Sequence, residues 1–100
     1  LSFLRADICQ AKAWGALAMG TSSRKLADRF AQDAQQQGFI LGLNAMTGGR
    51  IVTLPGGVLM VDDAGDIVGA LGVAGGPSDL DEACAVAAIS AVGLQPGDGA

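Results

Sequence analysis

Two short hydrophobic runs, separated by an acidic turn that contains glycine, constrain this chain more than any other feature. The runs cover residues 58 to 61 and 67 to 73, and the turn between them reads Asp-Asp-Ala-Gly-Asp, with Gly65 where positive φ is tolerated. β-Branched residues in such runs favour strands, and acidic residues with a glycine between them are typical of a hairpin turn. The sequence therefore predicts an antiparallel hairpin over residues 58 to 73.

A helix is predicted directly after this hairpin. Gly75 and Gly76 form a corner, and the helix is expected over about residues 79 to 92, with Ser78 and Asp81 in a spacing that resembles a capping box. Acidic residues in its first turn suit the positive end of the helix dipole. Small residues make a face that we expect to press closely on the sheet: Leu80, Ala83, Cys84, Ala87, Ala88 and Ala91.

The amino-terminal half is predicted to be helical. Apolar residues recur at helical spacing over residues 4 to 19, and Gly20 follows where a glycine commonly ends a helix. A second helix is expected to start after Ser22 or Ser23, because either hydroxyl can cap its free amides. We expect this second helix to end near Gly38.

The middle of the chain and its carboxyl end carry weaker signals. We interpret residues 39 to 49 as irregular, and their glycines match neither common nucleotide-binding pattern, which argues against a nucleotide site. Residues 50 to 54 are predicted to form a strand that ends at Pro55, because proline has no amide hydrogen to donate. We expect one domain over residues 1 to 93 and a flexible tail over residues 94 to 100.

Composition indicates a small domain whose core is built from small aliphatic residues. Half of the 100 residues are hydrophobic, only four are aromatic and sixteen are glycine, so backbones are expected to approach one another closely. The net charge of −4 is unevenly distributed: residues 1 to 50 hold all six basic groups and three acidic ones, and residues 51 to 100 hold the other seven acidic groups. The two halves should attract each other, and so few basic groups disfavour a nucleic-acid partner.

Disulfide, metal and membrane chemistry are disfavoured. Cys9 and Cys84 are each surrounded by small apolar residues, so we interpret them as buried hydrophobes and not as a disulfide. The chain has no histidine, the commonest metal ligand and general base. No apolar run reaches the length of about 18 residues needed to span a membrane. The first residue, Leu1, indicates a shortened chain, so a cytoplasmic location is the default expectation and a secreted or periplasmic one stays open.

An ordered set of short motifs is similar to that of a known family. The motifs are Asp7-x-Cys-x-Ala-Lys12-Ala13, Leu54-Pro-Gly-Gly-Val58, Asp63-x-Gly65-x-Ile67-Val-Gly-Ala70, Gly72-Val-x-Gly-Gly76 and Asp81-Glu82-Ala83-Cys-Ala85. In this order they resemble the GlcG/HbpS-like family, which includes the carboxy-terminal domain of PduO-type proteins. The resemblance covers about residues 3 to 93, and its most specific part runs from Pro55 to Ala85.

The resemblance implies an α/β (α+β) fold of profilin-like type, in which helices flank a mostly antiparallel sheet. It also implies assembly into dimers or larger homo-oligomers. Family members commonly begin with a further helix and strand pair that this sequence lacks, so we expect an exposed sheet edge unless a partner covers it. Some members bind haem, and others occur with glycolate or propanediol metabolism. A haem held by histidine cannot be carried over to this chain.

The main functional hypothesis is a small, self-associating protein that binds a ligand or serves as an accessory protein, without catalysis. Bare glycine amides near a helix start, together with basic side chains, suit a small anionic molecule. The ligand-binding residues that we expect are Arg5, Lys12, Pro55, Gly56, Gly57, Gly75 and Gly76. Arg5 or Lys12 could instead pair with the acidic residues that begin the last helix, and the sequence leaves this open.

Two other functions stay open. The first is a haem-binding or haem-handling protein, whose iron ligands would come from sulfur-containing residues that fit packing roles better: Met19, Met46, Met60, Cys9 and Cys84. The second, less favoured, is an enzyme that uses Asp7, Lys12 or Glu82 as an acid or base. Carboxylates at helix starts are usually caps, and no nucleophile and base pair is evident. Neither a metal site nor a membrane partner is expected.

Overall fold

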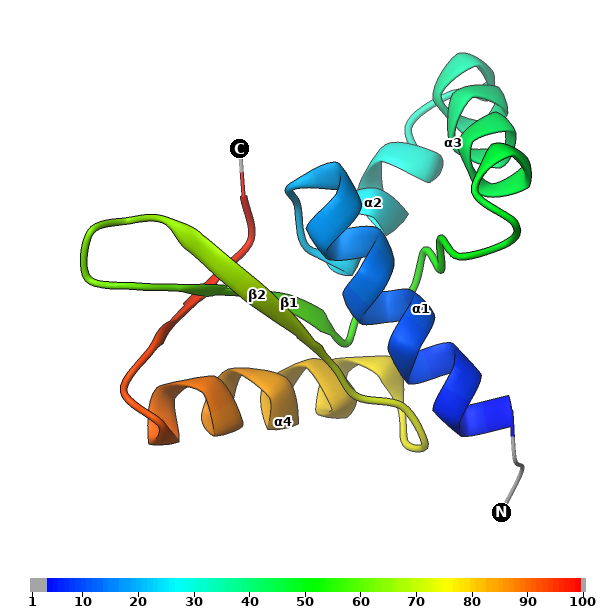
Figure 1. Cartoon of the computed structure of the whole chain (residues 1–100). Coiled ribbons are helices and arrows are strands. Elements are labelled where there is room, and N and C mark those ends of the chain that lie inside the picture. The colour runs from blue at the N-terminus through cyan, green and yellow to red at the C-terminus, as the bar shows by residue number, and fades with distance from the viewer. Residues whose placement is uncertain (1–3, 100) are drawn as a thin grey trace.

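The computed structural model describes residues 4 to 99 and has an α+β architecture, as expected. Its elements, in chain order, are α1 (Leu4–Met19), α2 (Ser23–Phe30), α3 (Ala34–Met46), β1 (Gly57–Val61), β2 (Ile67–Gly72), α4 (Ser78–Ala91) and β3 (Gln95–Gly97). The three strands form one antiparallel sheet in the order β2-β1-β3. Helix α4 runs along the sheet, and α3 lies at the opposite end of the molecule from the hairpin turn (Figure 1).

The hairpin prediction is confirmed. β1 and β2 pair in antiparallel fashion, and the turn between them is held by the Asp62 carboxylate, which accepts the amides of Ala64 and Asp66 at 3.0 and 2.9 Å. Gly65 has a φ of 85°, in the left-handed region where glycine meets no steric penalty. The turn therefore has the conformation that its sequence indicates.

A pair of opposed glycines lets α1 lie directly against this hairpin. Gly57 and Gly72 are partners in the register of β1 and β2. A Cβ added at Gly72 would overlap the carbonyl oxygen of Cys9, and one added at Gly57 would overlap that of Lys12. Backbone therefore packs on backbone at this crossing, which is the close approach that a glycine within a strand makes possible.

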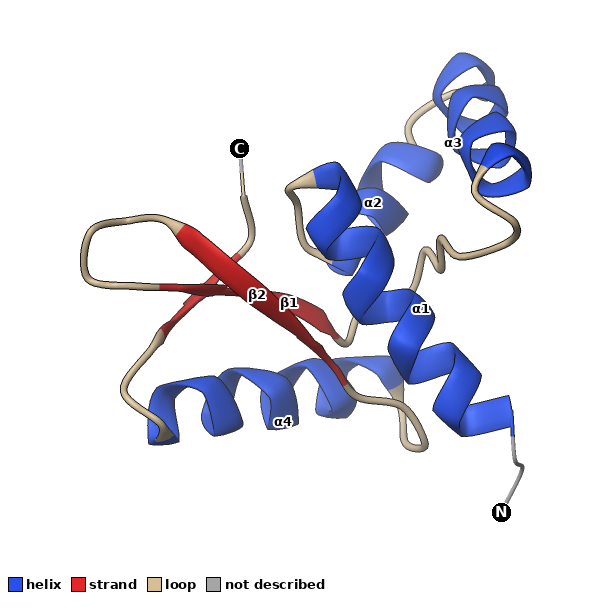
Figure 2. Cartoon of the chain, in the orientation of Figure 1, coloured by secondary structure: helices blue, strands red, loops and turns tan. Residues whose placement is uncertain are grey.

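The core consists of two small clusters. One joins the helices α2 and α3 to the segment after α3 and is centred on Leu26, Ile40 and Ile51. The other lies between the sheet and α4 and is centred on Val58, Ala85 and Ile89. Figure 2 shows the two layers that enclose this second cluster, the strands and α4, next to each other. Ala85 and Ile89 are one helical turn apart, so they form a continuous stripe.

The face of α4 that contacts the sheet differs from the predicted one. Leu80 is 62% exposed and Cys84 is also exposed, whereas Asp81, Ala85 and Ile89 are buried. Packing favours this face because Ile89 buries more apolar surface than an alanine can. Both cysteines are free, and the prediction that both are buried is wrong for Cys84, while Cys9 is only half-buried.

Helix α3 replaces a segment that we expected to be irregular. The predicted second helix stops at Phe30, and Asp33 begins a new helix by accepting the amide of Gln36 at 2.8 Å. The predicted strand over residues 50 to 54 is also wrong, since the Ile51 amide donates to the Asn44 side chain at 2.9 Å. Both segments contribute one buried residue to the same core cluster, in which Ile40 of α3 and Ile51 of the following loop pack with Leu26, and this tertiary packing overrides weak local propensities.

Residues 95 to 99 form strand and bridge pairs where we expected a flexible tail over residues 94 to 100, and Ala100 lies outside the described residues. Gln95–Gly97 forms β3 and pairs with β1, and Thr21 and Gly99 form a further bridge. Lys25 Nζ donates to the Gly99 carbonyl at 2.9 Å. Within residues 4 to 99, no helix has both the length and the apolar character needed to cross a membrane.

Candidate functional site

Lys12 is at the centre of the predicted site, and its charge is already compensated. It is 2% exposed, and its Nζ donates to the Val73 carbonyl at 2.9 Å and to an Asp81 carboxylate oxygen at 3.4 Å. The second Asp81 oxygen accepts the Gly76 amide at 3.0 Å. The predicted capping role of Ser78 is wrong, because Pro77 is the residue before the helix and provides no side-chain cap. Pairing with Asp81 is the alternative that the sequence left open.

The predicted glycines surround this ion pair. A Cβ at Gly56 would lie 2.9 Å from Lys12 Nζ, and one at Gly76 would lie 3.2 Å from Asp81 Oδ1. The space that these glycines leave is thus occupied by Lys12 and Asp81. The structure therefore brings the predicted residues together around an internal ion pair.

Arg5 lies at the edge of this cluster. Its guanidinium lies 3.4 Å from the position of a Cβ at Gly75, whose φ is 124°. The Arg5 side chain forms no ion pair with residues 4 to 99. Pro55 is half-buried and precedes Gly56. Arg5 is therefore the cation that remains for an anionic ligand at these turns, and that ligand stays a prediction.

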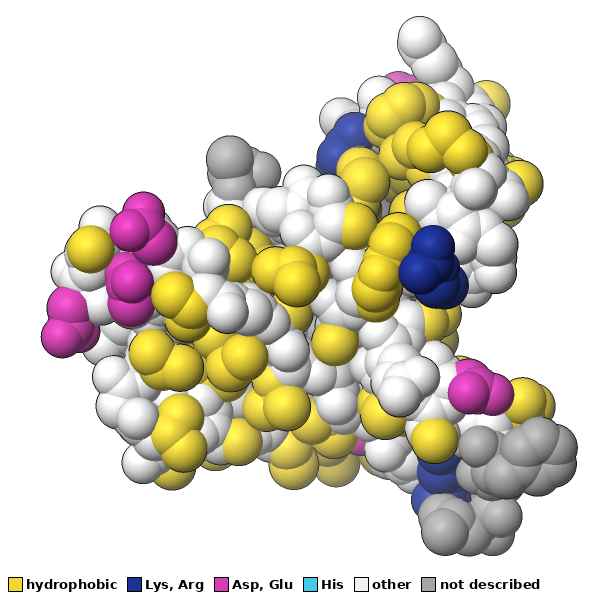
Figure 3. Space-filling view, viewed as in Figure 1, with side chains coloured by type: hydrophobic (Ala, Val, Ile, Leu, Met, Phe, Trp, Pro, Cys, Tyr) yellow, Lys and Arg dark blue, Asp and Glu magenta, His cyan; other side chains and the backbone are white. Residues whose placement is uncertain are grey.

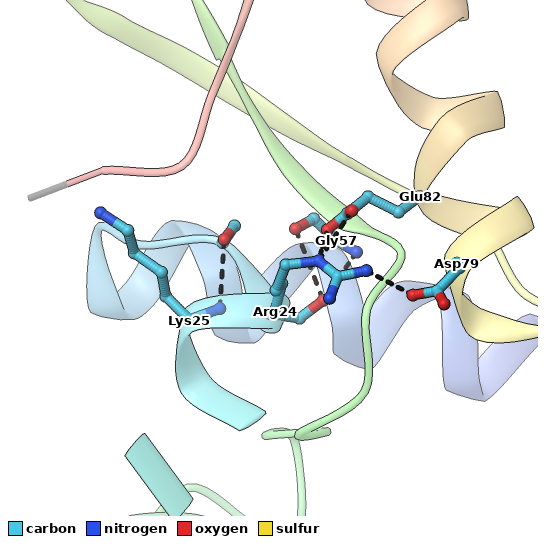
Figure 4. A network of polar contacts seen from close by, with 7 residues as sticks. Arg24, Lys25, Gly57, Asp79 and Glu82 are labelled. Carbon is cyan, nitrogen blue, oxygen red and sulfur yellow. Dashed lines mark hydrogen bonds and ion pairs between the residues drawn. The ribbon is translucent and has the colours of Figure 1, made fainter. Parts of the chain in front are cut away.

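A second charged network joins α2 to α4, and it was not predicted from the sequence. Arg24 Nε donates to both oxygens of Glu82 at 2.8 and 2.9 Å, and Arg24 Nη2 pairs with Asp79 (Figure 4). The pKa of the Arg24 guanidinium is raised, most by its hydrogen bond to Asp79 and next by its hydrogen bonds to Glu82. Beside this network the buried Ser23 hydroxyl accepts the Gly57 amide at 2.7 Å.

The uneven charge of the chain could have revealed this network. The ion pairs among residues 4 to 99, this network included, join basic residues of the first half to acidic residues of the second half: Lys12 with Asp81, Arg24 with Asp79 and Glu82, and Lys25 with Asp98. The prediction that the halves attract each other is confirmed. The carboxylates of α4 thus hold α1 and α2 in place, so these carboxylates have a structural role.

A cleft of about 640 Å³ opens beside α1 and is lined mainly by apolar groups. Its lining comes from α1, from β2 and from the loop after α3: Asp7, Gln10, Ala11, Ala13, Trp14, Leu17, Gly48, Gly49, Arg50 and Ala70. Figure 3 shows this side of the molecule, where hydrophobic side chains cover much of the surface and a basic group lies beside them. Lys12 is not part of this lining, so the cleft and the predicted site are different places.

Trp14 and Arg50 form one wall of this cleft, and sequence reasoning missed both. The Arg50 guanidinium lies over the Trp14 ring, 4.0 Å from its centroid, and Arg50 Nε donates to the Thr47 carbonyl at 2.8 Å. The absence of a side chain at Gly15 lets the loop after α3 lie close to α1, because a Cβ there would lie only 3.3 Å from the Arg50 carbonyl oxygen. The signal was weak, since Trp14 reads as part of an apolar stripe and Arg50 as the start of a strand.

The comparisons with known proteins agree with this architecture. The model of a family described as "Haem degrading protein HbpS-like" matches residues 1–90. The chain belongs to the HbpS-like family. This confirms the resemblance that the motifs between Pro55 and Ala85 carry most specifically.

One curated relative of this HbpS-like chain is the corrinoid adenosyltransferase PduO of Salmonella typhimurium strain LT2, with 33% identity over 88 residues. The match covers 88% of this chain and 25% of PduO, so the chain spans about a quarter of the length of that relative. Among solved structures, the "PduOC:Heme Complex" matches with a TM-score of 0.79 and 30% identity, over 97% of this chain and 67% of that one.

Proposed function

We propose that this HbpS-like chain binds haem. One observation carries the proposal: a structure solved as a complex with heme matches 97% of the chain at 30% identity and a TM-score of 0.79. Sequence similarity at this level over nearly the whole chain goes beyond a shared fold. The family description, which names haem degradation, supports the same ligand class.

The residues around the Trp14 cleft fit the haem ring. A volume of about 640 Å³ lies within the usual range of roughly 300 to 1,000 Å³ for small-molecule and cofactor sites. Trp14, Leu17 and several alanines offer an apolar wall to a flat ring, and the Arg50 guanidinium can pair with a propionate carboxylate. Bound haem would supply iron chemistry, whereas these residues supply binding and orientation.

Haem added to the purified chain should therefore give a saturable shift of the Soret band. Because Trp14 is the single tryptophan and lines the cleft, its fluorescence should fall in parallel with that shift. A Phe39→Ala variant controls for adsorption, since Phe39 is 49% exposed and does not line the cleft. The control should bind haem as the parent does. Absence of any Soret shift at stoichiometric haem would refute the proposal.

Self-association is part of the same proposal. Strand β2 is at an edge of the sheet, and its Ile67 and Val68 are 45% and 54% exposed. An exposed apolar edge favours pairing with another chain. Sedimentation velocity at micromolar concentration should show a dimer or larger species, and Val68→Lys should shift it toward monomer. A compact monomer of the parent chain under these conditions would count against this expectation.

A further inference from the structure

Arg50 differs from three other basic residues, Lys12, Arg24 and Lys25, in having no carboxylate partner within residues 4 to 99. Those three each form an ion pair, whereas the hydrogen bond of Arg50 in this part of the chain uses only its Nε. Its two Nη groups therefore keep their donors available at an exposed position on the cleft wall. A guanidinium in this state can take a carboxylate in a two-point contact.

The Trp14 ring and the Thr47 carbonyl hold Arg50 in position before any ligand arrives. The stack at 4.0 Å fixes the plane of the guanidinium, and the 2.8 Å hydrogen bond fixes its Nε edge. A side chain that is already ordered loses less conformational entropy when it binds. The donors of Arg50 are thus oriented as a fork beside an apolar wall.

The cleft lining includes the Asp7 carboxylate but offers no usual ligand to haem iron. It contains no cysteine or methionine side chain, and the chain has no histidine or tyrosine, so the usual protein ligands of haem iron are missing from this set. The features of a tetrapyrrole that this lining can recognise are the face of its ring and its carboxylates. Iron would add little to the affinity of such a site.

On the basis of the proposed haem binding, we infer that the cleft selects a tetrapyrrole by its carboxylates and its ring face, and not by its metal. Arg50 is the carboxylate anchor, and Trp14 is the positioning residue that holds Arg50 and contacts the ring. The ligand class therefore extends to metal-free tetrapyrroles that carry free carboxylates. Esterified tetrapyrroles, which cannot accept the charged contact, fall outside it.

Titrations of the full chain with haem, metal-free protoporphyrin and protoporphyrin dimethyl ester test this inference, with Trp14 fluorescence and porphyrin absorption as readouts. Haem and the metal-free diacid should bind with similar affinity. The diester should bind about tenfold more weakly, because it loses a charge-assisted hydrogen bond. Arg50→Gln should weaken the diacid by the same factor and leave the diester unchanged.

Arg29→Gln is the matched control, because Arg29 also lies over an aromatic ring, 5.8 Å from the centroid of Phe39, but does not line the cleft. It should not change any of the three affinities. Arg50→Lys provides a second variant in case Arg50→Gln folds poorly; it keeps the charge, loses the fork and should give intermediate binding of the diacid.

The outcomes separate the two proposals. The inference is wrong and the proposed function stands if the parent chain binds haem, binds diacid and diester with equal affinity, and loses no affinity for the diacid in Arg50→Gln. A metal-free diacid that binds much more weakly than haem would also overturn the inference, because iron would then be recognised. If haem does not bind at all, the proposed function fails. Binding of the metal-free diacid alone would then overturn the inference as well, because the metal would decide which tetrapyrrole binds.

Discussion

Replacing Gly72 with alanine should lower the free energy of unfolding by about 3 kcal/mol, the upper part of the range for overpacking in a core. The added Cβ would overlap the Cys9 carbonyl oxygen and lie 3.0 Å from the Ala13 amide nitrogen. Both neighbours are backbone atoms of α1, so no side-chain rotation can relieve the overlap. Urea denaturation, followed by far-UV circular dichroism, measures the loss as a lower midpoint.

Gly69→Ala is the matched control for that substitution. Gly69 lies on the same strand, and the group that its added Cβ would approach is the terminal methyl of Met60, at 2.7 Å. That methyl is at the end of a flexible side chain and can move away. The loss in stability should therefore be clearly smaller than for Gly72→Ala. Equal, small losses for the two variants would mean that α1 does not lie against β2 as described.

Lys12→Met should be comparably damaging, with an expected loss of about 3 to 5 kcal/mol. The substitution leaves the Asp81 carboxylate buried, at 8% side-chain exposure, without its cation at 3.4 Å. An uncompensated buried charge costs far more than a broken pair at the surface. Denaturation at neutral pH measures the effect. Arg24→Met, which breaks the more exposed pairs with Asp79 and Glu82, should cost much less.

The double variant Lys12→Met with Asp81→Asn tests the physical reason. The side-chain oxygen that Asp81→Asn retains can still accept the Gly76 amide, which Asp81 accepts at 3.0 Å, and no buried charge remains. Most of the stability lost in Lys12→Met should therefore return. A double variant as unstable as the single one would show that lost packing of the Lys12 side chain, and not charge, explains the damage.

Elements with strong local signals could be predicted from the sequence. The hairpin depends on an acidic turn with Gly65, and the first helix on apolar spacing that ends at Gly20, and both kinds of signal act within a few residues. Helix α3 could not be predicted in this way. Its start depends on whether Asp33 caps a new helix, and its apolar residues become helical by packing Ile40 near Leu26.

The candidate site also divides into a part that the sequence predicts and a part that only the tertiary structure shows. The sequence placed Lys12 and the glycine turns at one location and named pairing with the acidic residues of the last helix as an alternative, which the Lys12 and Asp81 contact confirms. The cleft was not predicted. It requires the loop after α3 to fold back over α1, so that Arg50 reaches Trp14.

The amino-acid sequence by itself determined the hairpin, the helix that follows it, the attraction between the basic and acidic halves, and the family. These depend on turn chemistry, local periodicity, the distribution of charge and ordered motifs, which are all read along the chain. Tertiary structure alone decided which face of α4 is buried, that Gln95–Gly97 pairs with β1, and that Arg50 stacks on Trp14. The reason is that these outcomes compare the burial and pairing of residues distant in sequence, and no local pattern encodes that competition.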